Sequence, residues 1–446
     1  MKKILCIGTG GTIASELASD GLAPELNADQ LLLYVPQIRT FCSPTCMQIF
    51  SIDSTNMAPS RWLQMAACIQ KHYDEYDGFV ITHGTDTMAY SAAALSYLIQ
   101  HSPKPIILTG AQKPIGSDNT DSKINLEDAF RCACSSLRGV MVVFNGKVIR
   151  GTRARKTHSK SFRAFSSINY PELAYIQDGH VLTFIQPDCL DRPVFYNQLG
   201  ERVALLKMIP GTDSALLEWL LEHNDALIIE SFGVGGRPSY RGSEFSDLMA
   251  RAIAQGKTIV MTTQVENEGS NLSIYSVGNR LKTELGVLEA YDMTTEAVVA
   301  KLMWILGQTK HPQQIRRLFY SPVSDDLPLY HPVDGTHTYV PSLPTGTSVP
   351  ATSIRASAYA NMPLYTSPSM RAISVFIVRV MFLMFATFVR RAASLRMSVN
   401  LPIAMTERIA TIATTNISSM SVKPDFVPLC MLVSFMPADY AGLLPV

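Results

Sequence analysis

Two hydroxyl residues follow glycines directly after apolar runs, where a side chain at a strand end can meet a ligand. The first is Thr12, in GTGGTIAS (8–15) after the apolar run ILCI. A glycine-rich turn after a strand is typical of nucleotide-binding loops, but Ile13 occupies the third glycine position, and no Lys-Ser or Lys-Thr follows. The stretch therefore favours, over a nucleotide site, a strand-end hydroxyl at Thr12 behind glycines that let substrate approach closely. Such a hydroxyl can act as a nucleophile if another group activates it.

The second hydroxyl residue is Thr85, in THGTDTMAY (82–90), where Asp86 follows it. A hydroxyl, a carboxylate and the first free N–H groups of a helix would meet there, and such N–H groups suit a developing oxyanion. A simpler reading stays open, in which Asp86 only caps the helix and Thr85 is a turn residue. His83 is expected to be a structural histidine rather than a catalytic base.

The elements that must hold these residues alternate between strand and helix. Apolar runs predict strands over 77–84, 104–110, 225–233 and 257–264. Apolar positions at helical spacing predict helices over 87–100, 125–134 and 245–256. Asn145-Gly146 between two apolar runs predicts a hairpin over 139–151. The alternation predicts an α/β fold of two doubly wound domains with largely parallel sheets, whose ligands bind at the carboxyl ends of strands.

Composition divides the chain further. CLDRPVFYNQLGERV (189–203) lacks clean periodicity, so it is expected to link a first domain over 1–188 to a second over 204–330. No Asp or Glu lies between Gly335 and Thr406, whereas mixed charge normally keeps globular surfaces soluble. Residues 331–446 are therefore expected to form an atypical C-terminal extension of unknown or no structure, or to arise from a reading-frame artefact.

The extension contains AISVFIVRVMFLMFATFV (372–389), which is apolar apart from Arg379, Ser374 and Thr387. An arginine near the middle of a membrane span costs about 3 kcal/mol. Membrane contact through 372–389 is therefore the weaker alternative.

Charge and cysteine usage limit the classes of partner. Lys and Arg total 38 against 37 Asp and Glu, a net charge of +1, which offers no electrostatic footprint for nucleic acid. The eight cysteines are irregularly spaced and predict neither a metal site nor a disulfide framework. The apolar run after Lys2 and Lys3 is too short for a signal peptide. We expect a cytoplasmic protein without metal or other cofactor and with a small-molecule substrate.

TGGTIAS and HGTDTM together resemble the two signatures of the bacterial-type L-asparaginase family. The likeness covers residues 1 to about 325, and DSTNM, TGAQKPIGSD, GTRARKTH and FSSINYP resemble its cytoplasmic type I branch. The resemblance implies hydrolysis of L-asparagine to L-aspartate and ammonia through a threonine acyl-enzyme, without a cofactor.

The resemblance also assigns catalytic roles. It implies Thr12 as nucleophile and Thr85, Asp86 and Lys156 as a second catalytic set, with Lys156 polarising Thr85 or its water and Asp86 holding the substrate ammonium. A threonine hydroxyl needs such activation because it is a poor nucleophile at its own pKa. Without the resemblance, Lys156 could be one more member of a basic hairpin that contains Arg150, Arg153 and Arg155.

IDSTNM supplies the substrate-binding candidates. The resemblance implies that Ser54 and Thr55 bind the substrate α-carboxylate and α-amino group, and small hydroxyls suit that work. Without it the stretch is only a polar turn. Asn56 stands where relatives often carry Asp, so it is given no role.

The sequence departs from the family pattern in two places. SELASDGLAPEL (15–26), the segment that resembles the flap, has no tyrosine, and Leu22 lies about where one is expected. A glutamate lent by a neighbouring subunit in some relatives has no clear match, and Asn279, Glu266 and Glu268 are the nearest candidates. The family assembles as dimers and tetramers, so a homodimer or homotetramer is expected.

Other functions remain open on the sequence alone. A glutaminase-asparaginase of broader specificity is the near alternative, because one methylene is worth only about 1 to 3 kcal/mol of discrimination. A related amidotransferase subunit that acts on charged tRNA is disfavoured, because Thr12 lies too near the start of the sequence for the additional N-terminal domain expected of that subunit. A non-catalytic amino-acid-binding protein tethered by its C-terminal tail is the alternative from another class.

Overall fold

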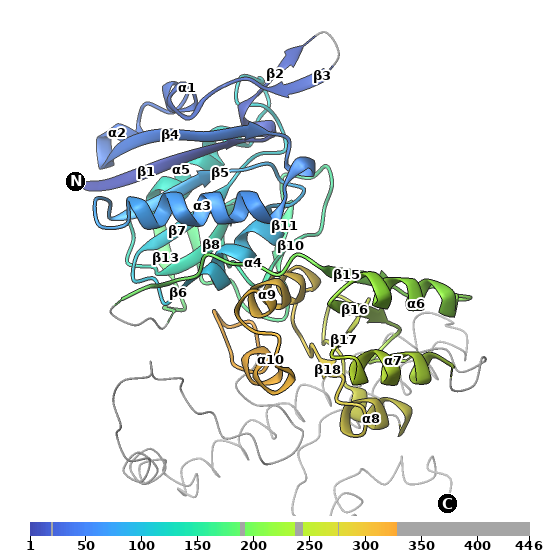
Figure 1. The fold of residues 1–446 in the computed structure, drawn as a ribbon. Helices are drawn as coiled ribbons and strands as arrows, with labels where there is room; N and C mark the ends of the chain where they lie inside the picture. The colour runs from blue at the N-terminus through green and yellow to red at the C-terminus, as the bar shows by residue number, and fades with distance from the viewer. Residues whose placement is uncertain (19–20, 188–191, 237–243, 275, 328–446) are drawn as a thin grey trace, which may run out of the picture. The chain divides into compact units, whose positions relative to one another are not determined.

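The computed structural model describes residues 1–18, 21–187, 192–236, 244–274 and 276–327 (Figure 1). All the described residues belong to one compact unit, which lies within Met1–Val340. The predicted extension 331–446 and its apolar run 372–389 lie outside the described residues. Among the described helices, none is both long and apolar enough to cross a membrane.

An eight-stranded sheet forms the core of the N-terminal region, in the order β13-β12-β9-β8-β7-β5-β1-β4. The five neighbouring strands β4, β1, β5, β7 and β8 run parallel. The strands β9, β12 and β13 continue the sheet with antiparallel pairing. The strands are β1 (Lys2–Gly10), β4 (Cys42–Ile52), β5 (Gly78–Thr82), β7 (Pro105–Thr109), β8 (Gly139–Phe144), β9 (Lys147–Arg150), β12 (Ala174–Gln177) and β13 (His180–Thr183). The predicted parallel-rich sheet is confirmed.

Helices cover both faces of this sheet because its inner strands are apolar on both sides. Leu5 and Ile7 of β1 face one core, which holds α3 (Pro59–Lys71) and α4 (Met88–Leu98). Ile4 and Cys6 face the opposite core, which holds α1 (Ala28–Leu33), α2 (Ile38–Phe41) and α5 (Ser122–Ala133). Alternate residues of a strand point to opposite faces, so continuous apolar runs require two covering layers. The doubly wound arrangement is thereby confirmed for this sheet.

The predicted hairpin forms between β8 and β9. Its turn residues Asn145 and Gly146 both adopt positive φ, 50° and 72°. Such a turn matches the twist of antiparallel strands, and Asn-Gly is the sequence that favours it. The chain continues from β9 into β10 (Ala154–Lys156), which pairs with β11 (Phe165–Ser167).

A smaller sheet of four parallel strands forms the C-terminal region, in the order β15-β16-β17-β18. The strands are β15 (Val203–Lys207), β16 (Ala226–Ser231), β17 (Thr258–Thr263) and β18 (Leu288–Glu289). One face packs on α6 (Ser214–His223), α7 (Glu244–Ala254) and α8 (Ser276–Thr283), and the other on α9 (Thr295–Gln308) and α10 (Pro312–Phe319). The predicted strand, helix, strand series of this region is also confirmed.

The two sheets share one hydrophobic core. The helices α4 and α9 lie side by side (Figure 1), and their residues belong to the same buried cluster. Tyr97 of α4 stacks on Trp304 of α9 with ring centroids 6.0 Å apart. The connection also packs on this core, since β14 (Val194–Phe195) pairs with β6 (Ile99–Gln100). The boundaries at 188 and 203 stay a prediction.

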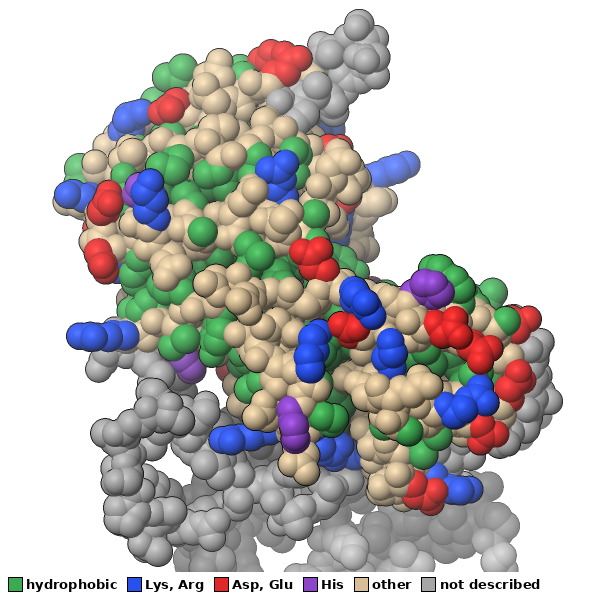
Figure 2. Space-filling model, in the orientation of Figure 1, with side chains coloured by type: hydrophobic (Ala, Val, Ile, Leu, Met, Phe, Trp, Pro, Cys, Tyr) green, Lys and Arg blue, Asp and Glu red, His purple; other side chains and the backbone are tan. Residues whose placement is uncertain are grey.

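Short elements complete the described chain. They are the hairpin of β2 (Ser15–Ala18) and β3 (Gly21–Pro24) and the 3-10 helices η1 (Thr12–Ala14), η2 (Ser54–Asn56) and η3 (Leu272–Ile274). On the face that Figure 2 shows, acidic and basic side chains of the described residues are interspersed, as the balanced composition leads one to expect.

Candidate active site

The candidate residues gather where three neighbouring parallel strands end. Thr12 follows β1, Thr85 and Asp86 follow β5, and Gln112 follows β7. These strands lie side by side, with β5 between β1 and β7. Parallel strands present their carboxyl ends at the same edge of a sheet, so residues distant in sequence meet there.

Glycines let the loops at this edge touch one another. A Cβ atom at Gly10 would overlap the backbone of Ile52, and one at Gly11 would overlap the backbone of Gly84. A Cβ atom at Gly84 would lie 2.7 Å from Cβ of Ser54. Protein therefore fills the space beside these glycines, and the expectation that substrate fills it is wrong. Their role is to bring the loops that carry Thr12, Ser54 and Thr85 into contact.

Thr12 begins the single turn of η1 and is half-buried. The turn is anchored by Ile13, which is fully buried in the core beneath and whose carbonyl accepts a bond from the Ile115 N–H at 3.3 Å. This burial is the physical reason for an isoleucine where a nucleotide loop has glycine. Within the described part of the chain, the Thr12 hydroxyl makes no hydrogen bond, so it remains available to a ligand.

Lys156 joins Thr85 and Asp86 into one hydrogen-bonded set. Its Nζ donates to Oγ1 of Thr85 and to Oδ1 of Asp86, both at 2.7 Å. Thr85 is buried, whereas the Asp86 side chain is 57% exposed and that of Lys156 is 17% exposed. The structure thus brings together three of the four predicted catalytic residues and leaves the carboxylate open to solvent.

The open alternative for Asp86 is excluded by the start of α4. The residue at the N-cap position is Thr87, and no side chain caps the helix. The Asp86 carboxylate turns instead to Lys156, and the Thr87 hydroxyl donates to the carbonyl of Ser54 at 2.8 Å. Asp86 is therefore held for an interaction outside its own helix.

Lys156 also differs from the arginines of its segment. Each arginine pairs with an acid of the C-terminal part of the chain: Arg150 with Asp325 (2.9 Å), Arg153 with Asp292 (3.0 Å) and Arg155 with Glu266 (3.4 Å). Lys156 pairs with Asp86 at the strand ends of the N-terminal sheet. Neighbouring residues of a strand point to opposite faces, so β10 directs Arg155 and Lys156 to different partners.

The two substrate-binding candidates lie next to Asp86 in the turn η2. Ser54 is buried, and its Oγ accepts a bond from the Asp86 N–H at 3.3 Å. Thr55 is exposed, and its hydroxyl and N–H both donate to Oδ1 of Asp53, at 2.9 and 2.8 Å. The turn is thus fixed by Asp53 and held against the helix that follows Asp86.

His83 is a structural residue, as expected. It is fully buried, its Nδ1–H donates to the Gly84 carbonyl at 2.6 Å, and its Nε2 accepts from the Ser91 hydroxyl at 2.8 Å. Burial lowers the pKa of His83 to about 4, against the weaker opposing effect of the Gly84 carbonyl. A neutral imidazole with both nitrogens occupied supports the loop and does not face the site.

Gln112 is a site residue that has no predicted role from the sequence. Its Oε1 lies 3.4 Å from the Thr85 hydroxyl, and its Nε2 donates to the Ser161 carbonyl at 3.0 Å. The Asp121 carboxylate fixes the backbone by accepting the Gln112 N–H at 3.1 and 3.0 Å. The signal that could have found it is its position directly after a third apolar strand, the same position that marked Thr12 and Thr85.

The candidate flap and the candidates for a lent residue occupy separate elements. The flap forms the hairpin β2–β3, which follows Thr12 directly, and Leu22 lies in β3. Glu266 pairs with Arg155 of the same chain, the Glu268 N–H donates to Asn169 at 2.9 Å, and Asn279 lies on α8.

The acids at the strand ends are engaged with protein groups. Asp86 pairs with Lys156, and Asp53 accepts from the backbone of Thr55. Across the described ranges, no group of three or more His, Cys, Asp or Glu side chains is placed to hold a metal ion.

Comparison with known proteins gives consistent matches. Two family models match, "Asparaginase, N-terminal" over residues 3–188 and "Glutaminase/Asparaginase C-terminal domain" over residues 202–319. An L-asparaginase of Thermococcus kodakarensis is 38% identical over 327 residues, which are 73% of this chain and 99% of that protein. A solved structure of the L-asparaginase from that organism superimposes with a TM-score of 0.70 over 73% of this chain and 99% of the other.

Two further relatives define the range of the similarity. The crystal structure of L-asparaginase I from Vibrio cholerae has 30% identity and a TM-score of 0.66, and the match covers 74% of this chain and 99% of the other. A glutamyl-tRNA(Gln) amidotransferase subunit of Pyrococcus abyssi is 32% identical over 74% of this chain and 78% of that protein. The two L-asparaginases are 38% and 30% identical to this chain, and each match covers 99% of the relative. Both signature stretches also lie at the ends of parallel strands. The chain therefore belongs to the asparaginase family.

Proposed function

We propose that this protein hydrolyses the side-chain amide of L-asparagine to give L-aspartate and ammonia, with Thr12 as nucleophile. The observation that carries the proposal is the Lys156, Thr85 and Asp86 set, in which one ammonium bonds a buried hydroxyl and an exposed carboxylate at 2.7 Å each. The set faces the strand edge from which Thr12 also projects. Membership of the asparaginase family and the similarity to L-asparaginases support the same reaction.

In the first half of the reaction, the Thr12 Oγ attacks the amide carbon of the substrate side chain. A C–O bond forms, the C–N bond breaks, and ammonia leaves with the proton that Thr12 loses. The acyl-enzyme ester holds the remaining aspartyl group. Because a threonine hydroxyl is weakly nucleophilic by itself, its reactivity depends on this half-buried setting and on substrate that excludes water.

In the second half, a water molecule beside Thr85 attacks the ester carbon. The new C–O bond to water forms, the bond to Thr12 breaks, and the Thr12 hydroxyl recovers a proton. The Lys156 ammonium polarises the Thr85 hydroxyl through its 2.7 Å bond, and Thr85 in turn orients the water. Gln112 limits the directions in which the Thr85 hydroxyl points.

Substrate recognition is proposed to centre on Asp86. Its Oδ1 accepts the bond from Lys156, which leaves Oδ2 to accept one from the substrate ammonium. We assign Ser54 and Thr55 to the substrate α-carboxylate and α-amino group. Ser54 is buried, so it acts through the backbone of its turn and through Asp86, whereas the Thr55 hydroxyl is exposed and can exchange Asp53 for substrate.

Assembly and location follow as further proposals. We infer a homodimer or homotetramer, because the chain belongs to the asparaginase family and the resemblance to that family implies such an assembly. A cytoplasmic location fits the similarity to L-asparaginase 1 of Escherichia coli, 34% identical over 73% of this chain. The likeness to an amidotransferase subunit makes glutamine the second substrate to test.

The test measures ammonia release from L-asparagine and from L-glutamine with the full-length protein. We expect turnover of asparagine that falls by about 10³-fold or more in Thr12→Ala and Lys156→Ala, while both variants keep the wild-type circular dichroism spectrum. Thr9→Ala is a matched control, because Thr9 is buried near the end of β1 and its hydroxyl bonds the Thr82 carbonyl rather than any candidate catalytic or substrate-binding residue.

Binding measurements separate an enzyme from an amino-acid-binding protein. If the wild type binds asparagine but releases no ammonia, the enzyme proposal fails. Equal kcat/KM for asparagine and glutamine would instead assign the broader glutaminase-asparaginase activity.

A further inference from the structure

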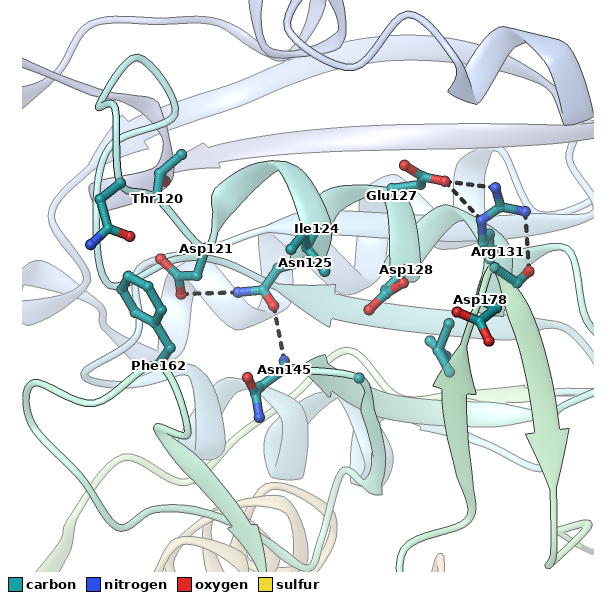
Figure 3. Close-up of a pocket in the computed structure, with 14 residues that line it drawn as sticks. Thr120, Asp121, Ile124, Asn125, Glu127, Asp128, Arg131, Asn145, Phe162 and Asp178 are labelled. Carbon is teal, nitrogen blue, oxygen red and sulfur yellow. Dashed lines mark hydrogen bonds and ion pairs between the residues drawn. The ribbon is translucent and has the colours of Figure 1, made fainter.

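A groove lies along α5, and its lining does not include Thr12, Ser54, Thr55, Thr85, Asp86 or Lys156. It is bounded by α5, by the turn between β8 and β9, by the end of β12 with the turn that follows, and by Phe162 (Figure 3). Its volume is about 580 Å³, within the range of sites for small molecules. None of the residues proposed for catalysis or substrate binding lines it.

The groove carries an excess of acid, and part of that acid is already paired. Glu127 bonds Arg131 at 2.6 Å, and Asp121 accepts from the Gln112 backbone and from Asn125 Nδ2 at 3.1 Å. The remaining carboxylates belong to Asp128 on α5 and Asp178 in the β12–β13 turn. With four acids against one arginine, the lining attracts cations.

Asp128 is the decisive residue. Its side chain points from α5 into the groove, and only 9% of the residue's surface is exposed (Figure 3). Among the residues that the structure describes, none donates a hydrogen bond to this carboxylate or pairs with it. The Asp128 carboxylate therefore takes its hydrogen bonds from water in the groove or from a ligand, unless it is protonated.

The charges around Asp128 favour a bound ligand, rather than another side chain of the protein, as the partner of its carboxylate. Burial, with a smaller contribution from Glu127, raises the pKa of Asp128 to about 7, against the opposing effect of Arg131. Arg131 does not pair with Asp128, and its guanidinium bonds Glu127 and the Gly179 carbonyl instead. The thiol of Cys132, one helical turn further along α5, is also buried and stays neutral, since burial and Asp128 raise its pKa.

We propose that this groove binds a small organic cation, a primary ammonium on a short aliphatic chain, with Asp128 as the carboxylate that receives the ammonium. Ile124 and Ile176 line the same groove and offer apolar contact to the chain. That mixture favours an alkylammonium over a hydrated metal ion, which needs several oxygen ligands. The exposed Asp178 at the rim attracts the cation before it enters.

The test titrates the full-length protein with n-butylammonium chloride at pH 8 and constant ionic strength, followed by calorimetry. The neutral isostere 1-butanol is titrated in parallel. We expect butylammonium to bind, and to bind at least tenfold more weakly to Asp128→Asn, which loses a charge-assisted hydrogen bond. Asp74→Asn, which removes an exposed acid on the segment after α3, should leave the affinity unchanged.

Two further binding measurements show where the cation binds. Binding to Asp86→Asn should persist, because the groove and the candidate active site are separate, and this arm also keeps the proposal independent of the hydrolytic function. Affinity should fall by about tenfold at pH 6 relative to pH 8, as Asp128 becomes protonated. Equal binding of 1-butanol, unchanged binding to Asp128→Asn, or loss of binding only in Asp86→Asn would each overturn the proposal.

Discussion

Two lysine–carboxylate pairs, one in each region of the protein, have the same geometry and different surroundings. Lys156 and Asp86 at the N-terminal strand ends lie 2.7 Å apart, and so do Lys301 of α9 and Asp326. The first pair has side chains 17% and 57% exposed, whereas both side chains of the second are fully buried. Distance alone therefore does not distinguish a reactive pair from a structural one.

The hydrogen bonds to the two carboxylates explain the difference. Lys301 also donates to the Ser321 carbonyl at 2.9 Å, and Asp326 accepts from the Tyr97 hydroxyl and the Val323 N–H, both at 2.8 Å. Burial lowers the pKa of Lys301, and the adjacent Asp326 opposes that shift. A buried pair in which both carboxylate oxygens have protein donors fixes the chain near residue 325, while a pair whose carboxylate has an open oxygen facing solvent can take a ligand.

The largest expected effect is loss of activity at the exposed pair. Lys156→Met removes the ammonium that polarises Thr85, so kcat for asparagine should fall by about 10³-fold. The free energy of unfolding should change by less than about 1 kcal/mol, because the Asp86 carboxylate is 57% exposed and ion pairs with a solvated partner contribute little. Steady-state kinetics and urea unfolding check both. A variant that unfolds easily but turns over normally when folded would reverse the roles of the two pairs.

The buried pair should show the opposite pattern. Lys301→Met leaves Asp326 buried without its counter-ion and should destabilise the protein by about 3 to 5 kcal/mol. Activity per folded molecule should stay near that of the wild type, measured below the unfolding transition. A selective loss of kcat with unchanged stability would show that the buried pair takes part in the reaction.

A third buried group makes the N-terminal strand ends sensitive to acid. His83 has a pKa of about 4 in the folded protein against 6.5 ordinarily, so the unfolded chain binds its proton more readily. The contribution of the neutral His83 to the free energy of unfolding is fully present above pH 6.5. It is lost as the pH falls toward 4, by about 3 kcal/mol in total. Urea unfolding from pH 7 to 4 measures the slope, and His83→Gln should flatten it. An unchanged slope in that variant would assign the acid sensitivity to other groups.

The smallest effect is expected at Gln112, which touches the exposed pair only through Thr85. Gln112→Leu removes the acceptor at 3.4 Å and should lower kcat by about tenfold while KM changes little. Kinetics at several pH values, with Gln112→Glu as the polar comparison, test this. If KM rises while kcat is retained, Gln112 acts on substrate binding instead.

Much of the fold and part of the site were predictable from local pattern. Apolar runs indicated the strands, helical spacing indicated α4 and α7, and Asn145-Gly146 indicated the hairpin, because each depends on neighbouring residues alone. Gln112 and the contacts of the glycines were missed. Both depend on which strands lie side by side, and that order does not follow from the period of any one strand.

The sequence by itself determined that hydroxyl residues follow glycines at strand ends, and that Thr12, Thr85 and Asp86 stand there. Only the tertiary structure decided that Lys156, 70 residues beyond Asp86, reaches the same edge while Arg155 turns to an acid of the C-terminal region. It also decided which charges are buried, leaving Asp86 open, Lys301 enclosed and Asp128 without a donor in the described chain. Side-chain chemistry is set locally, whereas distance and solvent exposure are set by strand order and packing.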